Sequence, residues 1–339
     1  MDGSPLRCVF AMKSRFLQFQ KTGDPEQVIE LGERELRPLK PNEVRVAMRY
    51  APVNPADLNY MEGTYARAAH PPAIPGHEGV GQVVEVAAEV TSLSVGEIVI
   101  PLLGAGCWAQ HLTAEEQFFA KLPSDIDLKQ ASMLRVNPVT AWRLLEGFVT
   151  LRPGAWVAQN AGNSGVGRAV IQIASKLGFH TVSFVRRREL VEELEDLGAD
   201  LVFMDDEEGL SLAKAALKGR EPLLAGNAVG GDSAIRLMDL LAPEGTLVTY
   251  GAMSRRSLKV PNKFLIFKNL RLSGLWITRW LEQASQNELF DVLHPLVEMV
   301  QEESLTTAVD AVFPMEECKA AMARAKAGGR GGKVLLKLD

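Results

Sequence analysis

The feature that most constrains the fold is an alternation of strand and helix patterns between residues 155 and 250. A short apolar run at 155–159 predicts a buried strand, and the residues after Gly165 carry one apolar stripe until Gly178 ends the helix. Further strand and helix patterns follow at 181–185, 189–197, 201–204, 223–228, 233–241 and 246–250. Strands that alternate with helices need right-handed crossover connections, which build a mostly parallel sheet. We therefore predict a doubly wound α/β domain over residues 129–276.

The first third of the chain has a different pattern. It contains short apolar runs, rich in β-branched residues and separated by Pro and Gly, at 44–48, 81–86 and 97–102. No helical pattern of any length interrupts these runs. The tail returns to strand patterns at 309–313 and 333–338. We predict a β-barrel domain over residues 1–128, which is rejoined by about 277–339.

Composition limits the classes of protein to which the chain can belong. Its 339 residues suit two domains, and 47% apolar with 23% charged residues is the balance of a globular protein. A formal net charge of −5 disfavours nucleic-acid binding, and no apolar run approaches the roughly 20 residues that span a bilayer. Three scattered cysteines do not predict a disulfide framework. Residues 1–16 lack the apolar core of a secretory signal, so we expect a cytoplasmic location, or a mitochondrial one if a transit peptide has been removed.

A glycine-rich loop at 160–167 lies directly between a predicted strand and a predicted helix. Glycines at 162, 165 and 167 allow the backbone to approach a pyrophosphate, and the helix N-terminus supplies N–H groups and a favourable dipole. The strand–loop–helix context predicts a dinucleotide site of the Rossmann type. The alternative is an ordinary glycine-rich turn.

The end of the next strand indicates which dinucleotide is bound. NAD sites commonly carry a carboxylate about 20 residues beyond the glycines, where it accepts from the ribose hydroxyls. Here the strand is followed instead by Arg186, Arg187 and Arg188. Guanidinium groups are suited to binding a phosphate, so we predict NADPH as the cofactor. The alternative is a helix start with solvated surface arginines.

The whole pattern resembles the medium-chain dehydrogenase/reductase superfamily and, within it, the zinc-independent mitochondrial-type trans-2-enoyl thioester reductases. One of the motifs that carry the resemblance is Pro-Gly-His-Glu-Gly-Val-Gly at 75–81. The others lie at 54–59, 63–65, 136–141, 160–167, 266–268 and 274–276. The chain departs from the family pattern at Arg135, where a small residue is typical. The resemblance implies a GroES-like β-barrel catalytic domain joined to a Rossmann domain.

The resemblance also bears on whether the chain binds zinc. Zinc enzymes of this superfamily hold the catalytic metal with two cysteines and a histidine. Here His77 and Glu78 are kept, but Asn54 and Asn137 stand in the regions where thiolates are expected. We therefore expect no metal site, and a role for His77 in positioning a turn.

The resemblance assigns the catalytic role to Tyr65. Hydride addition to the carbon β to a carbonyl places negative charge on the carbonyl oxygen, which needs a hydrogen-bond donor, and the α carbon needs a proton. A phenol with a reference pKa of about 10 is protonated at neutral pH and can donate. The alternative for Tyr65 is a half-exposed loop aromatic.

The remaining site residues follow from the resemblance, position by position, and all are expected to bind the cofactor. Trp276 is equally compatible with a core position, and Lys333 with a solvated charge on a flexible loop. The set is Asn137, Asn163, Ser164, Gly165, Val166, Arg186, Arg187, Arg188, Tyr250, Gly251, Ala252, Met253, Leu275, Trp276, Ile277 and Lys333.

The leading hypothesis for function is NADPH-dependent reduction of a 2-enoyl thioester carried by CoA or an acyl carrier protein. The first alternative is an NADPH:quinone or enone oxidoreductase of the same superfamily, and the second is a non-catalytic, NADPH-binding regulatory protein. A homodimer is expected, with the apolar stretch 258–276 supplying an edge strand for pairing.

Overall fold

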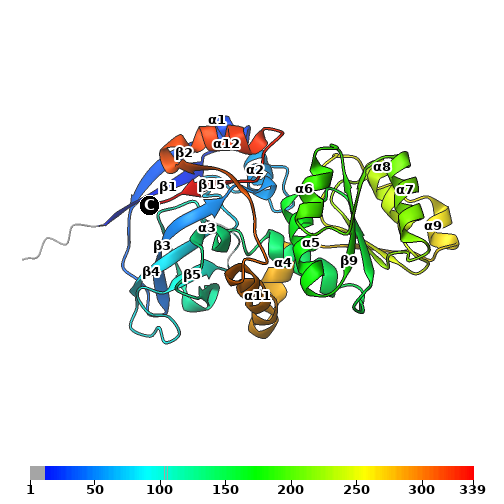
Figure 1. The fold of residues 1–339 in the computed structure, drawn as a ribbon. Coiled ribbons are helices and arrows are strands. Elements are labelled where there is room, and N and C mark those ends of the chain that lie inside the picture. The colour runs from blue at the N-terminus through cyan, green and yellow to red at the C-terminus, as the bar shows by residue number, and fades with distance from the viewer. Residues whose placement is uncertain (1–11, 103, 105) are drawn as a thin grey trace, which may run out of the picture. The chain divides into compact units, whose positions relative to one another are not determined.

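The structure is a computed structural model that describes residues 12–339 except 103 and 105 (Figure 1). Cys8 and most of the segment in which a targeting signal would lie are therefore outside the described residues. The chain forms two compact units, Met1–Met133 with Ala308–Asp339, and Leu134–Thr307. We call these the first and the second unit.

The boundaries of the units differ from the expected ones, which lay at residues 128 and 276. Residues 277–307 belong to the second unit because their contacts lie there. Helix α11 (Gln286–Gln301) packs against α4 (Asn137–Glu146). The amide of Gln172 donates to the carbonyl of Thr306 at 3.1 Å, and the backbone N–H of Thr306 donates back at 2.8 Å.

The first unit is built on a seven-stranded sheet. Six of its strands run in the order β14-β15-β3-β4-β5-β7. The seventh, β6, pairs with residues 43–47 of β3. All neighbouring strands are antiparallel except β14 and β15. Because β15 pairs with β3, the C-terminal tail rejoins the first unit. The strands are β3 (Glu43–Pro52), β4 (Val80–Val86), β5 (Ile98–Pro101), β6 (His111–Glu115), β7 (Phe119–Leu122), β14 (Val309–Pro314) and β15 (Lys333–Lys337).

A separate hairpin and several short helices complete the first unit. The hairpin strands β1 (Lys13–Phe19) and β2 (Ile29–Glu35) pair antiparallel. The core includes Trp108, which is fully buried, together with residues from β1, β3 and β15. The helices are α1 (Pro25–Val28), α2 (Pro55–Glu62), α3 (Leu128–Ala131), α12 (Cys318–Lys326) and the single 3₁₀ turns Glu116–Phe118 and Met315–Glu317.

The expectation that no helix interrupts the strands of this region is wrong at α2. Only Asp57 and Met61 of its eight residues are buried, so the helix has no apolar stripe for a periodicity search to detect. Its ends define it instead. Asn54 and Pro55 stand at the N-terminus, and Gly63 ends the helix in the left-handed conformation with φ of 76°.

The second unit contains the predicted parallel sheet. Its six strands run in the order β10-β9-β8-β11-β12-β13, and every neighbouring pair is parallel. This order confirms the doubly wound fold, because the chain leaves β8 in one direction and later crosses it to continue in the other. The strands are β8 (Trp156–Gln159), β9 (His180–Val185), β10 (Leu201–Met204), β11 (Leu224–Asn227), β12 (Thr246–Thr249) and β13 (Arg271–Gly274).

Helices cover both faces of this sheet. Figure 1 shows α5 and α6 on one face and α7 and α8 on the other. Each face has its own buried cluster, with Ile171 and Leu194 on the first and Leu210 and Leu237 on the second. The helices not yet named are α5 (Gly165–Lys176), α6 (Leu190–Asp196), α7 (Glu207–Leu217), α8 (Gly231–Leu240), α9 (Asn262–Ile266) and α10 (Ile277–Gln283). Within the described part of the chain, no helix combines the length and the apolar character needed to cross a bilayer.

Candidate active site

The glycine-rich loop connects β8 to the N-terminus of α5, as predicted. Ser164 caps the helix, and its hydroxyl accepts from the backbone N–H of Gly167 at 3.1 Å. A Cβ at Gly167 would lie 2.5 Å from the carbonyl oxygen of Gly162, so only glycine fits there. The first turn of α5 therefore comes close to the loop and directs its N–H groups to the end of the helix, an arrangement suited to an anion.

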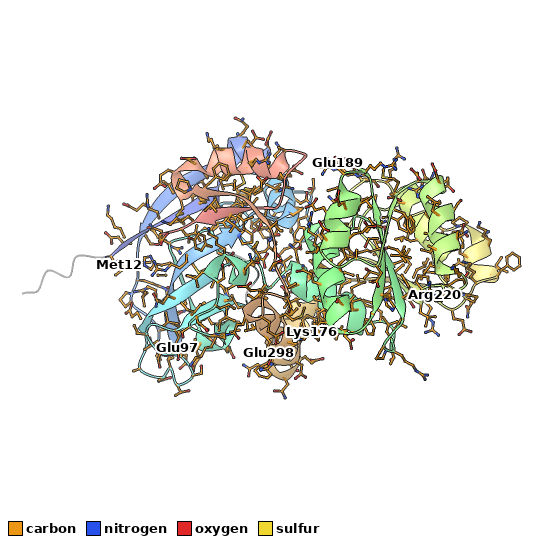
Figure 2. All side chains as sticks on the ribbon, in the orientation of Figure 1. Met12, Glu97, Lys176, Glu189, Arg220 and Glu298 are labelled. Carbon is orange, nitrogen blue, oxygen red and sulfur yellow. The ribbon has the colours of Figure 1, made fainter. Side chains whose placement is uncertain are left out.

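The three arginines directly follow β9, so they lie at the carboxyl ends of the strands, as does the glycine-rich loop after β8. The backbone N–H of Gly162 donates to the carbonyl of Phe184 at 3.1 Å, which brings the loop to the end of β9. Arg186, Arg187 and Arg188 are exposed. Arg187 forms an ion pair with Glu189 at 3.2 Å, and Glu189 projects from this surface in Figure 2. The side chains of Arg186 and Arg188 make no hydrogen bond or ion pair with any described residue, so their guanidinium groups are available to a phosphate.

Polar residues that were given no role from the sequence link the carboxyl ends of β8, β10 and β11. The amide nitrogen of Asn160 donates to Asn227 at 2.9 Å and to Ser233 at 2.8 Å, and its oxygen accepts from the backbone N–H of Ala228 at 2.7 Å. The hydroxyl of Ser233 donates to Asp205 at 2.6 Å. This chain of hydrogen bonds fixes the start of the glycine-rich loop. The signal in the sequence is a polar residue at the end of each of these strands.

The predicted nicotinamide-side residues of the second unit differ in their burial. Asn137, at the first position of α4, is 9% exposed, and its amide nitrogen is buried with no hydrogen-bond partner among the described residues. Burial raises the pKa of the Tyr250 phenol, which therefore stays protonated. Arg135 is buried as well. The exposed or half-buried members of the set are Gly251, Ala252, Met253, Leu275, Trp276 and Ile277.

In the first unit, a buried polar cluster is centred on Asp57. We call Asn54, Asp57, His77, Glu78 and Lys333 the Asp57 cluster. Asp57 accepts from the backbone N–H of Asn54 at 2.8 Å and from that of His77 at 3.0 Å, and its carboxylate lies 2.5 Å from His77 Nδ1. The amide nitrogen of Asn54 donates to Glu78 at 2.8 Å, and Lys333 Nζ donates to the amide oxygen of Asn54. All five residues are buried.

This cluster bears on three expectations. His77 does anchor a turn, since both its backbone N–H and its ring bond to Asp57. Lys333 is not a solvated loop charge, because it is 9% exposed and begins β15. Burial lowers its pKa, the carboxylates of Glu78 and Asp57 oppose that effect, and Arg330 adds to it. Contact of Lys333 with a cofactor stays a prediction.

The amide of Asn54 is engaged at both ends by Glu78 and Lys333, in the region where a zinc enzyme is expected to carry a thiolate. Groups of three or more His, Cys, Asp or Glu side chains placed to hold a metal ion do not occur among the described residues.

Tyr65 lies beside the Asp57 cluster. It follows Gly63 at the end of α2, and its backbone N–H donates to the carbonyl of Asn59 at 3.1 Å. The side chain is half-buried. Its ring meets the imidazole of His77 edge to face, with centroids 5.3 Å apart and planes at 74°. Tyr65 and Lys333 are thus held by one cluster in the first unit, and the other predicted site residues belong to the second unit.

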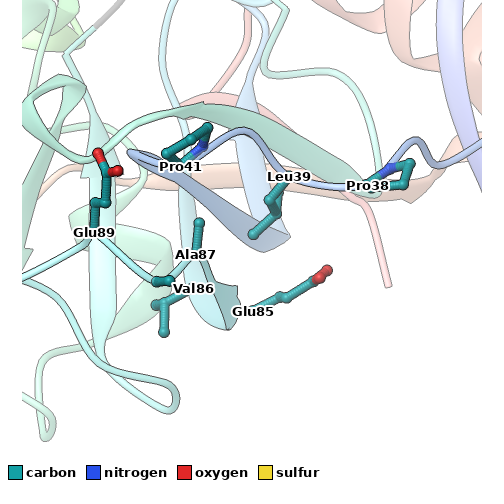
Figure 3. A pocket seen from close by; sticks show the side chains of 8 residues that line it. Pro38, Leu39, Pro41, Glu85, Val86, Ala87 and Glu89 are labelled. Carbon is teal, nitrogen blue, oxygen red and sulfur yellow. The ribbon is translucent and has the colours of Figure 1, made fainter.

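A shallow hollow of about 440 Å³ lies elsewhere in the first unit, beside the end of β4 (Figure 3). Proline, alanine and other aliphatic side chains form most of its lining. Of its two carboxylates, Glu85 is already paired with Arg45. Because no other polar side chains converge on it, the hollow has no groups for chemistry. Its lining is Pro38, Leu39, Pro41, Glu85, Val86, Ala87, Ala88 and Glu89.

Two family models match the chain. Residues 40–124 match the alcohol dehydrogenase GroES-like domain, and residues 165–298 match the zinc-binding dehydrogenase family. These matches confirm the expected pair of domain types, a GroES-like domain and a Rossmann domain.

Characterised proteins resemble the chain over nearly its whole length. The mitochondrial enoyl-[acyl-carrier-protein] reductase of Xenopus tropicalis is 40% identical over 321 residues, which cover 92% of each protein. The human enzyme of the same name is 40% identical over 314 residues, covering 91% of this chain and 84% of that protein. The expectation of a cytoplasmic location gains no support from these relatives, because their names place them in mitochondria.

Solved structures agree with this similarity. The mitochondrial 2-enoyl thioester reductase of Candida tropicalis, in the Etr1p/Etr2p heterodimer, has a TM-score of 0.88 and 30% identity over 96% of this chain and 100% of that one. A complex of Etr1p with NADP and crotonyl-CoA gives the same values. A putative NADPH:quinone reductase of Bacillus thuringiensis has a TM-score of 0.90 and 28% identity over 97% of this chain and 100% of that one. The chain therefore belongs to the medium-chain dehydrogenase/reductase superfamily and, within it, to the family of the mitochondrial enoyl thioester reductases.

Proposed function

We propose that the protein reduces the activated carbon–carbon double bond of a 2-enoyl thioester, carried by CoA or an acyl carrier protein, with NADPH. The observation that carries the proposal is Tyr65, a half-buried phenol held beside a cluster of residues that are hydrogen-bonded to one another. The similarity to Etr1p, which has been solved with NADP and crotonyl-CoA, supports the same substrate class.

The residues of the second unit fit NADPH. The cradle at Gly167 and the N-terminus of α5 suit the pyrophosphate, with Asn163, Ser164, Gly165 and Val166 as its lining. Arg186, Arg187 and Arg188 suit the 2′-phosphate. The buried amide nitrogen of Asn137 has no hydrogen-bond partner in the part of the chain that the structure describes, and it can donate to the nicotinamide ribose. We place residues 250–253 and 275–277 beside the nicotinamide half, and Lys333 near the cofactor.

NADPH supplies a hydride to the β carbon of the enoyl group, and the protein handles the charge and the proton. As the hydride adds, the electron pair of the double bond moves toward the carbonyl, whose oxygen becomes negative. The phenol of Tyr65 donates a hydrogen bond to that oxygen. A proton from the phenol or from solvent water is added to the α carbon and completes the saturated acyl thioester, and a phenol that has given its proton regains one from water. One hydride and one proton are consumed in each turnover, and NADP⁺ remains.

We propose that the protein works as a homodimer in mitochondria. β13 is the edge strand of its sheet, and all four of its residues are exposed. Ile266 and Phe267 nearby are 68% and 81% exposed, so a second copy could cover this edge. The Etr1p/Etr2p heterodimer and the names of the mitochondrial relatives support these two proposals.

A second candidate is an NADPH:quinone oxidoreductase, which the similarity to the Bacillus thuringiensis protein favours. Turnover of crotonyl-CoA, a quinone and a simple enone, each followed as loss of NADPH absorbance, distinguishes the candidates. We expect the highest kcat/KM with crotonyl-CoA. A preference for the quinone would support the second candidate, and NADPH binding without turnover of any substrate would indicate a non-catalytic protein.

A further inference from the structure

The pair formed by Asp57 and His77 is buried more deeply than its neighbour Tyr65. Asp57 is fully buried, and its two oxygens take three N–H groups. Oδ2 accepts from the backbone of Asn54, and Oδ1 faces both the backbone N–H and Nδ1 of His77. A carboxylate with this many donors stays in one place, and it fixes the imidazole through two points on the same residue.

The ring of His77 lies between two tyrosine rings. Tyr60 meets one part of it edge to face, with centroids 6.2 Å apart and planes at 83°, and Tyr65 meets another at 5.3 Å and 74°. Tyr60 in turn packs at 87° against Phe19, which is fully buried in the core of the first unit. Edge-to-face contacts of this kind are favourable and depend on angle. The array therefore connects the core to the ring of Tyr65.

The backbone around Tyr65 contrasts with this fixed array. Gly63 and Thr64 before it and Ala66, Arg67 and Ala68 after it are all exposed. The backbone N–H groups of Gly63, Thr64 and Tyr65 attach the segment to the end of α2, where they donate to the carbonyls of Asn59 and Tyr60. Such a segment needs side-chain packing to hold an aromatic ring at one angle.

We propose that Asp57 and His77 are positioning residues for Tyr65. The carboxylate fixes the imidazole, and the imidazole ring holds the phenol at the angle at which its hydroxyl meets the substrate. This inference rests on the catalytic role proposed for Tyr65, because it gives the pair a function only through that hydroxyl. A misplaced catalytic group loses rate even where binding is intact.

Two substitutions of His77 separate the ring from its anchor. His77→Phe keeps a ring against Tyr65 and removes the nitrogen that bonds to Asp57. His77→Asn keeps an N–H donor near the position of Nδ1 and removes the ring. The second unit offers a matched control, because His180 forms the same bond to Asp200, also at 2.5 Å, and its ring stacks on Trp156. His180→Asn is expected to leave the kinetics unchanged.

Each His77 variant is measured alone and combined with Tyr65→Phe, with crotonyl-CoA and NADPH as substrates. We expect each to lower kcat about tenfold with the KM for NADPH unchanged, and to lower it less than about twofold when Tyr65 is already Phe. Equal losses in both backgrounds, or no loss in either, would overturn the positioning role while leaving the role of Tyr65 intact. A Tyr65→Phe enzyme with normal kcat would instead remove the proposed role of Tyr65, and the positioning role with it.

Folding of each variant is checked by its thermal transition and by NADPH fluorescence. If both His77 variants fail to fold, Tyr60→Ala tests the same array at the half-buried ring that lies between Phe19 and His77. It is expected to lower kcat in the wild-type background and not in the Tyr65→Phe background. Equal effects in the two backgrounds would overturn the proposal.

Discussion

Among the described residues, two histidine–aspartate pairs share the same bond but have different surroundings. His77 and Asp57 in the first unit, and His180 and Asp200 in the second, both place Nδ1 2.5 Å from a carboxylate oxygen. A backbone N–H also donates to each carboxylate. The side chains of the first pair are 11% and 0% exposed, whereas those of the second are 45% and 32% exposed.

This difference in exposure decides what each pair can do. Water screens the second pair, and a solvent-exposed ion pair contributes at most about 1 kcal/mol. The first pair has no such screening, so removing one partner leaves a buried group without compensation. Their rings differ as well, since His77 meets Tyr65 and Tyr60 edge to face, while His180 stacks on Trp156 at 4.8 Å. The bond between histidine and aspartate does not by itself indicate a function.

The largest expected effect is on stability, and it comes from replacing the carboxylate of each pair. Asp57→Asn removes the buried charge and places an amide opposite N–H donors, so we expect a loss of about 3–5 kcal/mol in the free energy of unfolding. Asp200→Asn is expected to cost less than about 1 kcal/mol. Urea unfolding of both variants measures the two losses. Equal losses would show that burial does not distinguish the pairs.

The next effect concerns Tyr65, whose ring meets the imidazole of His77 in the first pair. Tyr65→Phe removes the hydroxyl and keeps the ring, so we expect kcat to fall about 100-fold or more with the fold intact. The matching change beside the exposed pair, Trp156→Phe, is expected to leave kcat unchanged. Steady-state kinetics with crotonyl-CoA measure both, and a normal kcat for Tyr65→Phe would contradict the proposed role.

A third prediction concerns the exposed arginines that follow β9 in the second unit. Arg186→Ala and Arg188→Ala each remove a charged donor to the 2′-phosphate, which is worth about 1.5–3 kcal/mol, so the KM for NADPH should rise about tenfold or more. The KM for NADH should stay the same. Arg220 is a control, because it precedes β11 at the amino ends of the strands and stacks on Trp156 at 5.1 Å. An equal rise for NADH would contradict binding of the phosphate.

The smallest expected effect concerns Glu43 in the first unit, whose carboxylate is paired with an arginine instead of a histidine. The hydrogen bond from Arg37 lowers the pKa of Glu43 to about 2. Because the pKa is depressed in the folded state, the stabilisation is complete above the ordinary glutamate pKa of about 4.3 and is lost as the pH falls toward 2. Glu43→Gln should therefore be less stable than the wild type at pH 7, with the difference narrowing at lower pH. Thermal unfolding across this range measures it, and a constant difference would contradict the assignment.

The sequence predicted best those elements that have a local signal. The strands of the parallel sheet are short buried runs, and Gly178 and Gly198 after α5 and α6 both have positive φ, so patterns and glycines located these elements. α2 was missed because its ends, rather than an apolar stripe, define it.

The candidate site shows the same limit. The glycine-rich loop and the arginines are each a single short run of the chain. The structure puts them after β8 and β9, at the strand ends where they were expected. The pairing of Asp57 with His77, and of Lys333 with Asn54, joins residues far apart in the chain. Single-sequence patterns carry no information on such pairs, because burial and distance arise only when the strands assemble.

Deuterium transfer from NADPH tests the proposed reaction most directly. With crotonyl-CoA and NADPH labelled at the transferable position of the nicotinamide, we expect a saturated acyl thioester that carries the deuterium on its β carbon and a hydrogen from solvent on its α carbon. Nuclear magnetic resonance of the product locates both. A reduced thioester without deuterium at the β carbon, or no reduced thioester at all, would contradict the proposal.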